Sequence, residues 1–265
     1  MPDILLTNDD GCKSAGFFPL LKELSKHFSV VSLTPDNEKS WISKAVTTKE
    51  KLRITSIKKE DLEIFLLNGT PADCVQIGLY NMLKTKPKIV VSGINLGSNV
   101  GHARILSSGT VGAAMEASIE GVKSIATSLR IPLEIKKTLD LYNEKTYPFF
   151  ENAAKITTKL TRLLIDKDFG VDADLFSINI PYDATLESEI EIAKPFKEPY
   201  GQLFHKKDDY FVHRTPRLEF KNLKDGTDLK ALSEGKISIT PISLSLFSEK
   251  PLKKFEKLLK KEWYQ

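Results

Sequence analysis

Short apolar runs alternate with amphipathic stretches through the first half of the chain. Short apolar runs are typical of buried strands, and apolar residues at three- and four-residue steps are typical of helices. The runs predict strands at 4–6, 29–33, 89–91 and 124–129, and the periodic stretches predict helices at 17–28, 71–83 and 111–120. Repeated β–α units of this kind build parallel sheets covered by helices. The predicted fold class is therefore α/β: a Rossmann-like, doubly wound, mostly parallel sheet.

The remaining segments change character. Residues 45–67 alternate between apolar and polar, with a charged cluster in the middle, which predicts a hairpin projecting from the sheet. A helix at 147–165 and a strand at 175–180 follow, and then the aromatic-rich segment 195–220 predicts extended hairpins. Residues 236–244 predict another strand, and 251–263 predict a terminal amphipathic helix whose apolar side chains face inward.

These patterns suggest two parts. Residues 1–190 form the expected Rossmann-like catalytic core, to which strands up to about residue 245 return. Residues 191–265 form the expected hairpin-rich C-terminal extension with its terminal helix. No separate core is apparent in this extension, and we expect it to serve in oligomerisation.

Composition excludes several classes of protein. A chain of 265 residues with 41% hydrophobic and 28% charged residues is typical of a globular protein, and a net charge of +4 does not require nucleic acid. No apolar run reaches the length of a membrane span, and no secretory signal is recognisable. Cys12 and Cys74 are too few for a disulfide framework, so we expect free thiols and a cytoplasmic location. The lysine-rich terminal helix is interpreted as a solvated face.

The first strand ends in the acidic pair Asp9 and Asp10, followed by Gly11. In open parallel sheets, ligands bind outside the carboxyl ends of the strands. Two neighbouring carboxylates repel each other there unless a cation or a proton relieves them. From this stretch alone, a divalent metal site and an acidic turn that caps the next helix have equal weight.

Two other strand ends carry oxygen ligands as well. Ser40 follows the second strand, and Asn95 follows the strand at 89–91. In a parallel sheet these loops emerge at one edge, so both residues could converge on Asp9 and Asp10. Carboxylate, hydroxyl and amide oxygens select a hard cation such as Mg²⁺ or Mn²⁺, and we expect one ion per subunit. Such a site could activate water and polarise a phosphoryl group.

A candidate anion site lies at the start of the helix at 111–120. Ser108, Gly109 and Thr110 combine two hydroxyls with a small residue at a helix N-terminus, where the backbone N–H groups and the helix dipole favour an anion. The alternative is ordinary N-capping by serine or threonine. The pattern is neither a P-loop nor a dinucleotide fingerprint.

Taken together, these motifs resemble the SurE family, the stationary-phase survival 5′-nucleotidases. The matching pieces occur in the family's order and span almost the whole chain: 5–11, 35–40, 68–75, 91–95, 108–110, 226–228 and 237–241. The resemblance implies a metal-dependent phosphatase that hydrolyses nucleoside 5′-monophosphates. The 3′-nucleotides and polyphosphate are further candidate substrates.

The resemblance also assigns roles to residues. It implies metal ligation by Asp9, Asp10, Ser40 and Asn95, and phosphate binding by Asn99, Ser108, Gly109 and Thr110. Either aspartate is also expected to assist proton transfer. Family members form homodimers, often homotetramers, through exchanged C-terminal segments. Two departures leave base preference open: Ser107 replaces a usual tyrosine, and the 102–107 loop is about one residue longer than is common.

Two other classes of protein share parts of this pattern. A response-regulator receiver module also places an acidic pair after its first strand, but no convincing phospho-accepting aspartate follows the third strand, and the chain is too long for that module alone. A nucleotide-binding protein without turnover would keep the pocket. The intact set of candidate ligands argues against it.

Overall fold

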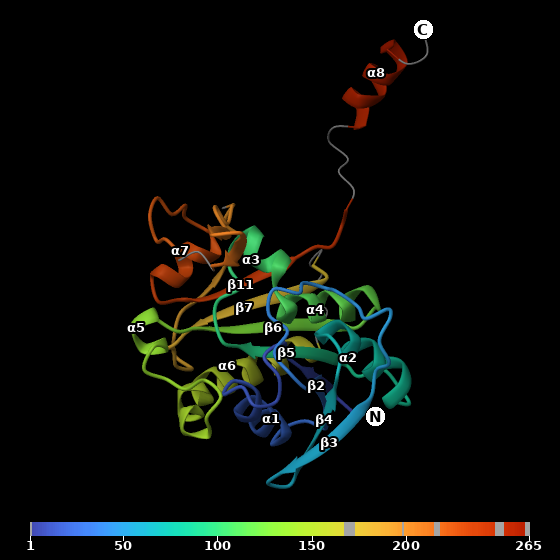
Figure 1. Cartoon of the computed structure of the whole chain (residues 1–265), viewed down its shortest axis with the longest axis vertical. Coiled ribbons are helices and arrows are strands. Elements are labelled where there is room, and N and C mark those ends of the chain that lie inside the picture. Colours follow the sequence, from blue (N-terminus) through green and yellow to red (C-terminus); the bar gives the residue numbers. More distant parts are fainter. Residues whose placement is uncertain (1, 167–172, 198, 215–217, 247–251, 263–265) are drawn as a thin grey trace.

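A nine-stranded sheet forms the centre of the molecule in the computed structural model, which describes residues 2–166, 173–197, 199–214, 218–246 and 252–262 (Figure 1). The strands lie in the spatial order β3 (Ile54–Lys59), β4 (Leu62–Leu67), β2 (Val30–Pro35), β1 (Ile4–Thr7), β5 (Ile89–Asn95), β6 (Lys123–Arg130), β7 (Leu175–Pro181), β11 (Ile237–Ile242) and β8 (Ile190–Ile192). From β4 to β7 every neighbouring pair is parallel. The α/β prediction is confirmed.

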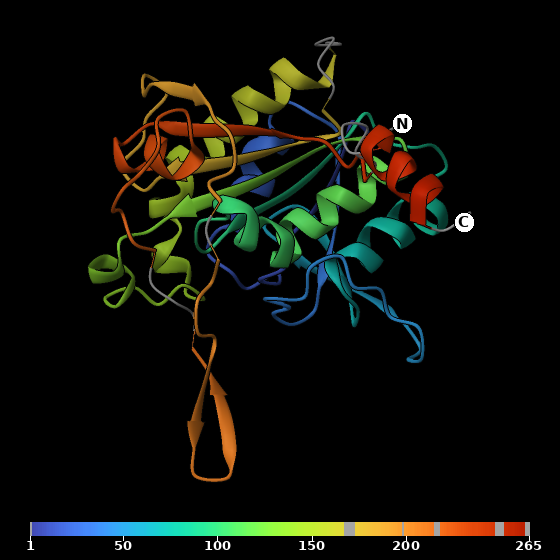
Figure 2. The ribbon, with the colours of Figure 1, turned by 90° about the horizontal axis from the view of Figure 1, so that it is seen from above.

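Helices cover both faces of this sheet (Figures 1 and 2). One layer contains α1 (Phe17–Ser25) and α6 (Pro148–Ile165), and the other contains α2 (Pro71–Ile77) and α4 (Gly109–Ile119). Successive strand residues point to opposite faces. Accordingly, Ile4 and Leu6 of β1 join the core beneath α1 and α6, whereas Leu5 joins the core beneath α2 and α4. Short elements complete the connections: η1 (Gly78–Met82), α5 (Leu133–Lys136) and η2 (Glu144–Thr146).

The strand order reverses beside β1. From β1 the chain continues outward through β2 on one side, and β5 pairs with β1 on its other side. Crevices outside the carboxyl ends of the strands at such a switch point are the usual ligand sites of open α/β sheets. The loops after β1, β2 and β5 all begin at this edge.

Two predictions about local structure were wrong. The hairpin of β3 and β4 does not project from the sheet, because β4 pairs in parallel with β2 and thereby extends the sheet. Residues 102–107, expected as a loop, belong to the helix α3 (Gly101–Ser107). The first error arose because the pairing of β4 with β2 joins segments that are far apart in the sequence. The second arose because α3 is a helix of only two turns without a side-chain cap, so the local sequence gives little sign of it.

The C-terminal third is more mixed than expected. It contains one hairpin of described strands, β9 (Phe204–Lys207) and β10 (Tyr210–His213), which projects far from the body (Figure 2). It also contains a short helix, α7 (Asp228–Ser233), that the aromatic pattern did not predict. The strand expected at 236–244 is confirmed as β11, which runs antiparallel to β7.

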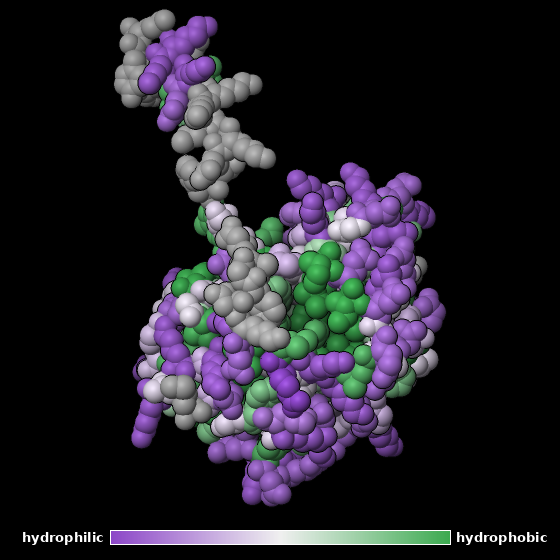
Figure 3. Space-filling model, turned by 180° about the vertical axis from the view of Figure 1, so that it is seen from behind, coloured by the Kyte–Doolittle hydropathy of each residue, from purple (hydrophilic) through white to green (hydrophobic). Residues whose placement is uncertain are grey.

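The last helix, α8 (Leu252–Glu262), stands away from the rest of the molecule (Figure 1). Its apolar residues do not face inward within this chain: Phe255 is 56% exposed and Leu258 is 54% exposed. Hydrophobic surface also appears on the body itself, on the face seen from behind in Figure 3. Within the described residues, no helix combines the length and apolar character that crossing a membrane requires.

Candidate active site

The turn after β1 is held by Asn8, whose side chain is fully buried. Its Nδ2 donates to the carbonyl oxygen of Gly11 at 3.0 Å, and its Oδ1 accepts the N–H of Gly11 at 3.2 Å and the hydroxyl of Thr34. Gly11 has a φ of +80°, which glycine adopts without steric cost. This closed ring reverses the chain, so that Asp9 and Asp10 both lie at the strand end.

Asp9 lies against the N-terminus of α4. Its Oδ1 accepts the hydroxyl of Thr110 at 2.5 Å, and the N–H of Thr110 also points at this carboxylate. The backbone oxygen of Asp9 accepts the N–H of Lys39 at 2.7 Å, which ties the turn to the loop after β2. In this structure the anion at the start of α4 is therefore the side chain of Asp9.

Asp10 is held from the other side. Its Oδ2 accepts the N–H of Leu96 at 3.0 Å, and Lys136 donates to the carbonyl oxygen of Leu96 at 2.8 Å. Asp10 is thus fixed by the segment that follows β5. Only 5% of its surface is exposed, and Asp9 is 3% exposed.

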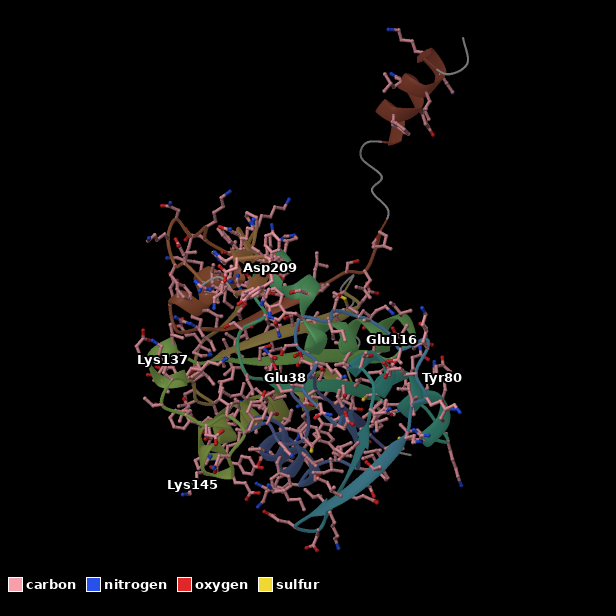
Figure 4. All side chains as sticks on the ribbon, in the orientation of Figure 1. Glu38, Tyr80, Glu116, Lys137, Lys145 and Asp209 are labelled. Carbon is pink, nitrogen blue, oxygen red and sulfur yellow. The ribbon has the colours of Figure 1, made fainter. Side chains whose placement is uncertain are left out.

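Ser40 lies on the exposed loop after β2. Its hydroxyl donates to Glu38 Oε1 at 2.6 Å, and Glu38 Oε2 accepts the hydroxyl of Tyr142 at 3.0 Å. Figure 4 labels Glu38 near the middle of the molecule, whereas Tyr80 and Lys145 mark its periphery. Glu38 therefore positions the Ser40 hydroxyl and adds a third negative charge to this edge of the sheet.

Asn95 and Asn99 are positioned by the backbone and by the next strands. Asn95 Nδ2 donates to the carbonyl oxygen of Gly97 at 2.7 Å, which leaves its Oδ1 as a possible ligand. Asn99 Nδ2 donates to Ser128 on β6 at 3.0 Å, and its N–H donates to Asn179 Oδ1 on β7 at 2.8 Å. The polar residues of three neighbouring strands thus fix this loop.

A pocket of about 140 Å³ brings most of the predicted residues together. Five of the eight line it: Asp9, Ser40, Asn95, Asn99 and Ser108. The other three are not in its lining, although each is close to it: Asp10 follows Asp9, and Gly109 and Thr110 follow Ser108 and touch Asp9. The convergence expected from the strand order is therefore present.

The segment 108–110 combines capping with packing. Ser108 is the N-cap of α4, because its hydroxyl accepts the N–H of Val111 at 3.1 Å. A hydroxyl that accepts one bond still carries a proton to donate. Gly109 makes room for Asp9: a Cβ there would lie 2.8 Å from the Cβ of Asp9. The hydroxyl of Thr110 is donated to Asp9 and not into the pocket.

Several residues in and around the pocket were not predicted as site residues from the sequence. Arg104 lines the pocket from α3 and brings a positive charge to it. Trp41 lines it from the loop after β2, next to Ser40. Asn8, which shapes the acidic turn, stands directly before the pair in the sequence. The sequence offered little signal for Arg104, because its side chain reaches the pocket only through the short helix α3.

The electrostatics of the acidic pair favour a cation. Burial raises the pKa of Asp9 to about 6, against hydrogen bonds from Thr110 that lower it. Burial and the charge of Asp9 raise the pKa of Asp10 well above its usual range. Two buried carboxylates with an amide and a hydroxyl nearby form an all-oxygen set that suits Mg²⁺ or Mn²⁺. Among the described residues, no group of three or more histidine, cysteine, aspartate or glutamate side chains is arranged to hold a metal ion.

The raised pKa of Asp9 predicts how the metal-free protein responds to pH. Its folded-state pKa of about 6 lies above the unfolded value of 3.8, so the folded protein favours the protonated form of Asp9. The contribution of this group to the free energy of unfolding is therefore complete below pH 3.8 and is lost as pH rises through about 6. The loss amounts to about 3 kcal/mol. The free energy of unfolding is measured with urea in EDTA for wild type and Asp9→Asn. The difference between the two proteins should grow from pH 4 to pH 7. A constant difference over that range would contradict the assignment.

Known proteins share this architecture. The family model described as "Survival protein SurE" matches residues 4–202. The chain belongs to the SurE family. A "5′-nucleotidase SurE" of Methanococcus vannielii is 37% identical, over 98% of this chain and 99% of that protein. A protein of the same name from Methanocaldococcus jannaschii is 38% identical over 91% of this chain and 92% of its own length. The crystal structure of the SurE protein from Aquifex aeolicus superposes with a TM-score of 0.77 at 30% identity, covering 96% of this chain and 98% of that one.

Proposed function

We propose that this protein is a divalent-metal-dependent 5′-nucleotidase, which hydrolyses nucleoside 5′-monophosphates to nucleosides and phosphate. The observation that carries the proposal is the convergence of Asp9, Ser40 and Asn95 on one pocket, beside the N-terminus of α4. Membership of a family whose similar relatives carry the name 5′-nucleotidase SurE supports it. The receiver module and the nucleotide-binding protein without turnover have no such support.

Asp9, Asp10, Ser40 and Asn95 are the proposed ligands of one Mg²⁺ or Mn²⁺ ion. A cation bound there polarises a phosphoryl oxygen and lowers the pKa of water. Asp9, which lines the pocket, is placed to take up the proton that the attacking water loses. The turn at Asn8 and Gly11 keeps both carboxylates oriented without reorganisation during the reaction.

The N-terminus of α4, which adjoins Asp9, is part of the proposed phosphate site. The Ser108 hydroxyl, the second hydrogen on Asn99 Nδ2 and the N–H of Gly109 at the first turn of α4 supply donors. Thr110 acts in this proposal by orienting Asp9, since its hydroxyl and N–H both point at that carboxylate. Arg104, which also lines the pocket, adds a positive charge that attracts an anionic substrate.

The proposal is tested by phosphate release from AMP and GMP, with Mg²⁺, with Mn²⁺ and with EDTA. We expect release with either metal and none after chelation, because the acidic pair cannot bind an anionic phosphate unaided. Adding 3′-AMP and polyphosphate to the panel tests the further candidate substrates. Binding of AMP without release of phosphate under any metal condition would overturn the proposal.

We also propose that the protein is a homodimer or homotetramer joined through its C-terminal extension. The projecting hairpin exposes Tyr210 and Phe211, and α8 exposes Phe255 and Leu258. Exposed apolar residues on elements that leave the body are typical of association sites. Light scattering should give two or four times the chain mass of 29.7 kDa, and a monomer at micromolar concentration would contradict this arrangement.

A further inference from the structure

Trp41 has an unusual backbone conformation at the mouth of the pocket. Its φ is +62°, a left-handed value that bulky side chains rarely adopt. The residue follows Ser40 directly, lines the pocket and is still 38% exposed. Strained residues that persist in a fold cluster at ligand sites. Nothing in the proposed metal or phosphate chemistry uses this side chain.

Aromatic neighbours hold the indole in place. Its ring centroid lies 5.1 Å from that of Tyr200, with planes tilted by 48°, and 4.7 Å from that of His213, with planes at 73°. The ring centroid of Phe204 lies 5.5 Å from that of His213, on the partner strand of the hairpin. The hydroxyl of Tyr200 donates to the carbonyl oxygen of Ala103 and contacts the Ser107 hydroxyl, both on α3. The aromatic cluster of Trp41, Tyr200 and His213 therefore joins the C-terminal hairpin to the wall of the pocket.

The size of the pocket indicates which part of a nucleotide fits inside it and which part lies outside, near the aromatic cluster. Its volume of about 140 Å³ is well below the 300 Å³ or more that is typical of a site enclosing a whole small molecule. It suits the phosphate end of a nucleotide. The sugar and base of the same molecule must then extend beyond the pocket, and the partly exposed Trp41 is one of the residues that line it.

We propose that Trp41, supported by Tyr200 and His213, is a specificity-determining residue that stacks on the nucleobase of the substrate. The inference rests on the proposed nucleotidase function and adds the chemical class that the site prefers: phosphomonoesters with an aromatic base over those without one. Stacking accepts any base, because every base has a π-face. The C-terminal hairpin thereby contributes to substrate recognition.

Kinetics with AMP and ribose 5-phosphate test the proposal, since the two esters differ only in the base. In Trp41→Gly, the ratio of kcat/KM for AMP to that for ribose 5-phosphate should fall about tenfold, within the usual effect of removing one base–aromatic stack. Trp41→Phe should keep most of the ratio. A ratio in Trp41→Gly within twofold of wild type would overturn the stacking role while leaving the nucleotidase function intact.

A binding measurement makes the test independent of turnover and of folding. Glycine adopts the left-handed backbone of position 41 without steric cost, so Trp41→Gly should fold, and its melting temperature is measured beside that of wild type. Trp263, the other of two tryptophans, lies outside the described residues and is replaced by phenylalanine. In Trp263→Phe, a non-hydrolysable phosphonate analogue of AMP should quench the emission of Trp41, and ribose 5-phosphate should not. Equal responses to both ligands, or none to either, would overturn the proposal.

Discussion

Asp9→Asn is expected to reduce metal-dependent release of phosphate from AMP on the order of a thousandfold, because it removes the charge of a proposed metal ligand from the pocket. The substitution keeps the shape of the side chain, and the Thr110 hydroxyl can still donate to the remaining Oδ1. The protein should therefore stay folded. Initial rates over a range of Mn²⁺ concentrations measure the loss and any decrease in metal affinity.

The same substitution should not destabilise the metal-free protein at neutral pH. Burial is the main reason that the pKa of Asp9 is raised, so its charge is unfavourable there without a cation. Asp10→Asn should behave similarly, because the repulsion within the pair disappears. If a variant loses activity while its melting temperature in EDTA is unchanged or raised, the carboxylate serves as a metal ligand. A carboxylate with a structural role would instead lower the melting temperature when it is replaced.

Asp228 provides the matched control. It is another buried aspartate whose pKa is raised by burial, outside the acidic pair, and it accepts the N–H groups of Gly101, Phe196 and Leu229. Asp228→Asn should lower stability, since an amide accepts fewer hydrogen bonds, yet it should leave the metal dependence of the reaction as in wild type. If Asp9→Asn retained more than a tenth of wild-type activity, Asp9 would not be a ligand.

The candidate site was predictable from the sequence where it depends on strand order. The apolar runs before Asp9 and before Asn95 mark the strands β1 and β5, and parallel neighbours bring their carboxyl ends together. Ser40 follows from the same rule, through β2. Pocket residues contributed by strand ends therefore require only the hydrophobic pattern and the topology that it implies.

What the sequence could not predict depends on contacts between distant residues. Thr110 donates to a carboxylate 101 positions away, and Gly109 leaves room for that same carboxylate. Trp41 reaches the pocket with a backbone conformation that no pattern indicates. Arg104 lies on a helix too short for its periodicity to be recognised. These positions are set by packing, and local sequence contains little information about them.

Gly109→Ala provides the sharpest test of this packing, because two principles predict opposite signs for it. Alanine is about 1 kcal/mol more favourable than glycine within a helix, so propensity alone predicts a more stable protein. Packing predicts the reverse, since the new Cβ would lie 2.8 Å from the Cβ of Asp9 and 3.0 Å from the carbonyl oxygen of Lys39. Real Cβ atoms essentially never approach that closely, so the acidic turn or the helix must shift.

We expect packing to prevail. Asp9 cannot retreat freely, because its carboxylate is bonded to Thr110 and its backbone oxygen accepts the N–H of Lys39 at 2.7 Å. Forced displacement in a close-packed region costs about 1–3 kcal/mol. Moving a ligand by about 1 Å can lower catalytic rate about a hundredfold. Urea unfolding and kcat with AMP should both decline in Gly109→Ala.

Gly97→Ala is the control for stability, since apart from its two chain neighbours the new Cβ would meet no atom nearer than Asn95 Nδ2 at 3.9 Å. That variant should unfold within about 0.5 kcal/mol of wild type, as is usual away from tight contacts. If Gly109→Ala were instead more stable than wild type and fully active, helix propensity would have prevailed. Asp9 would then not be held against α4 as the structure indicates, and the link between this helix and the metal site would have to be abandoned.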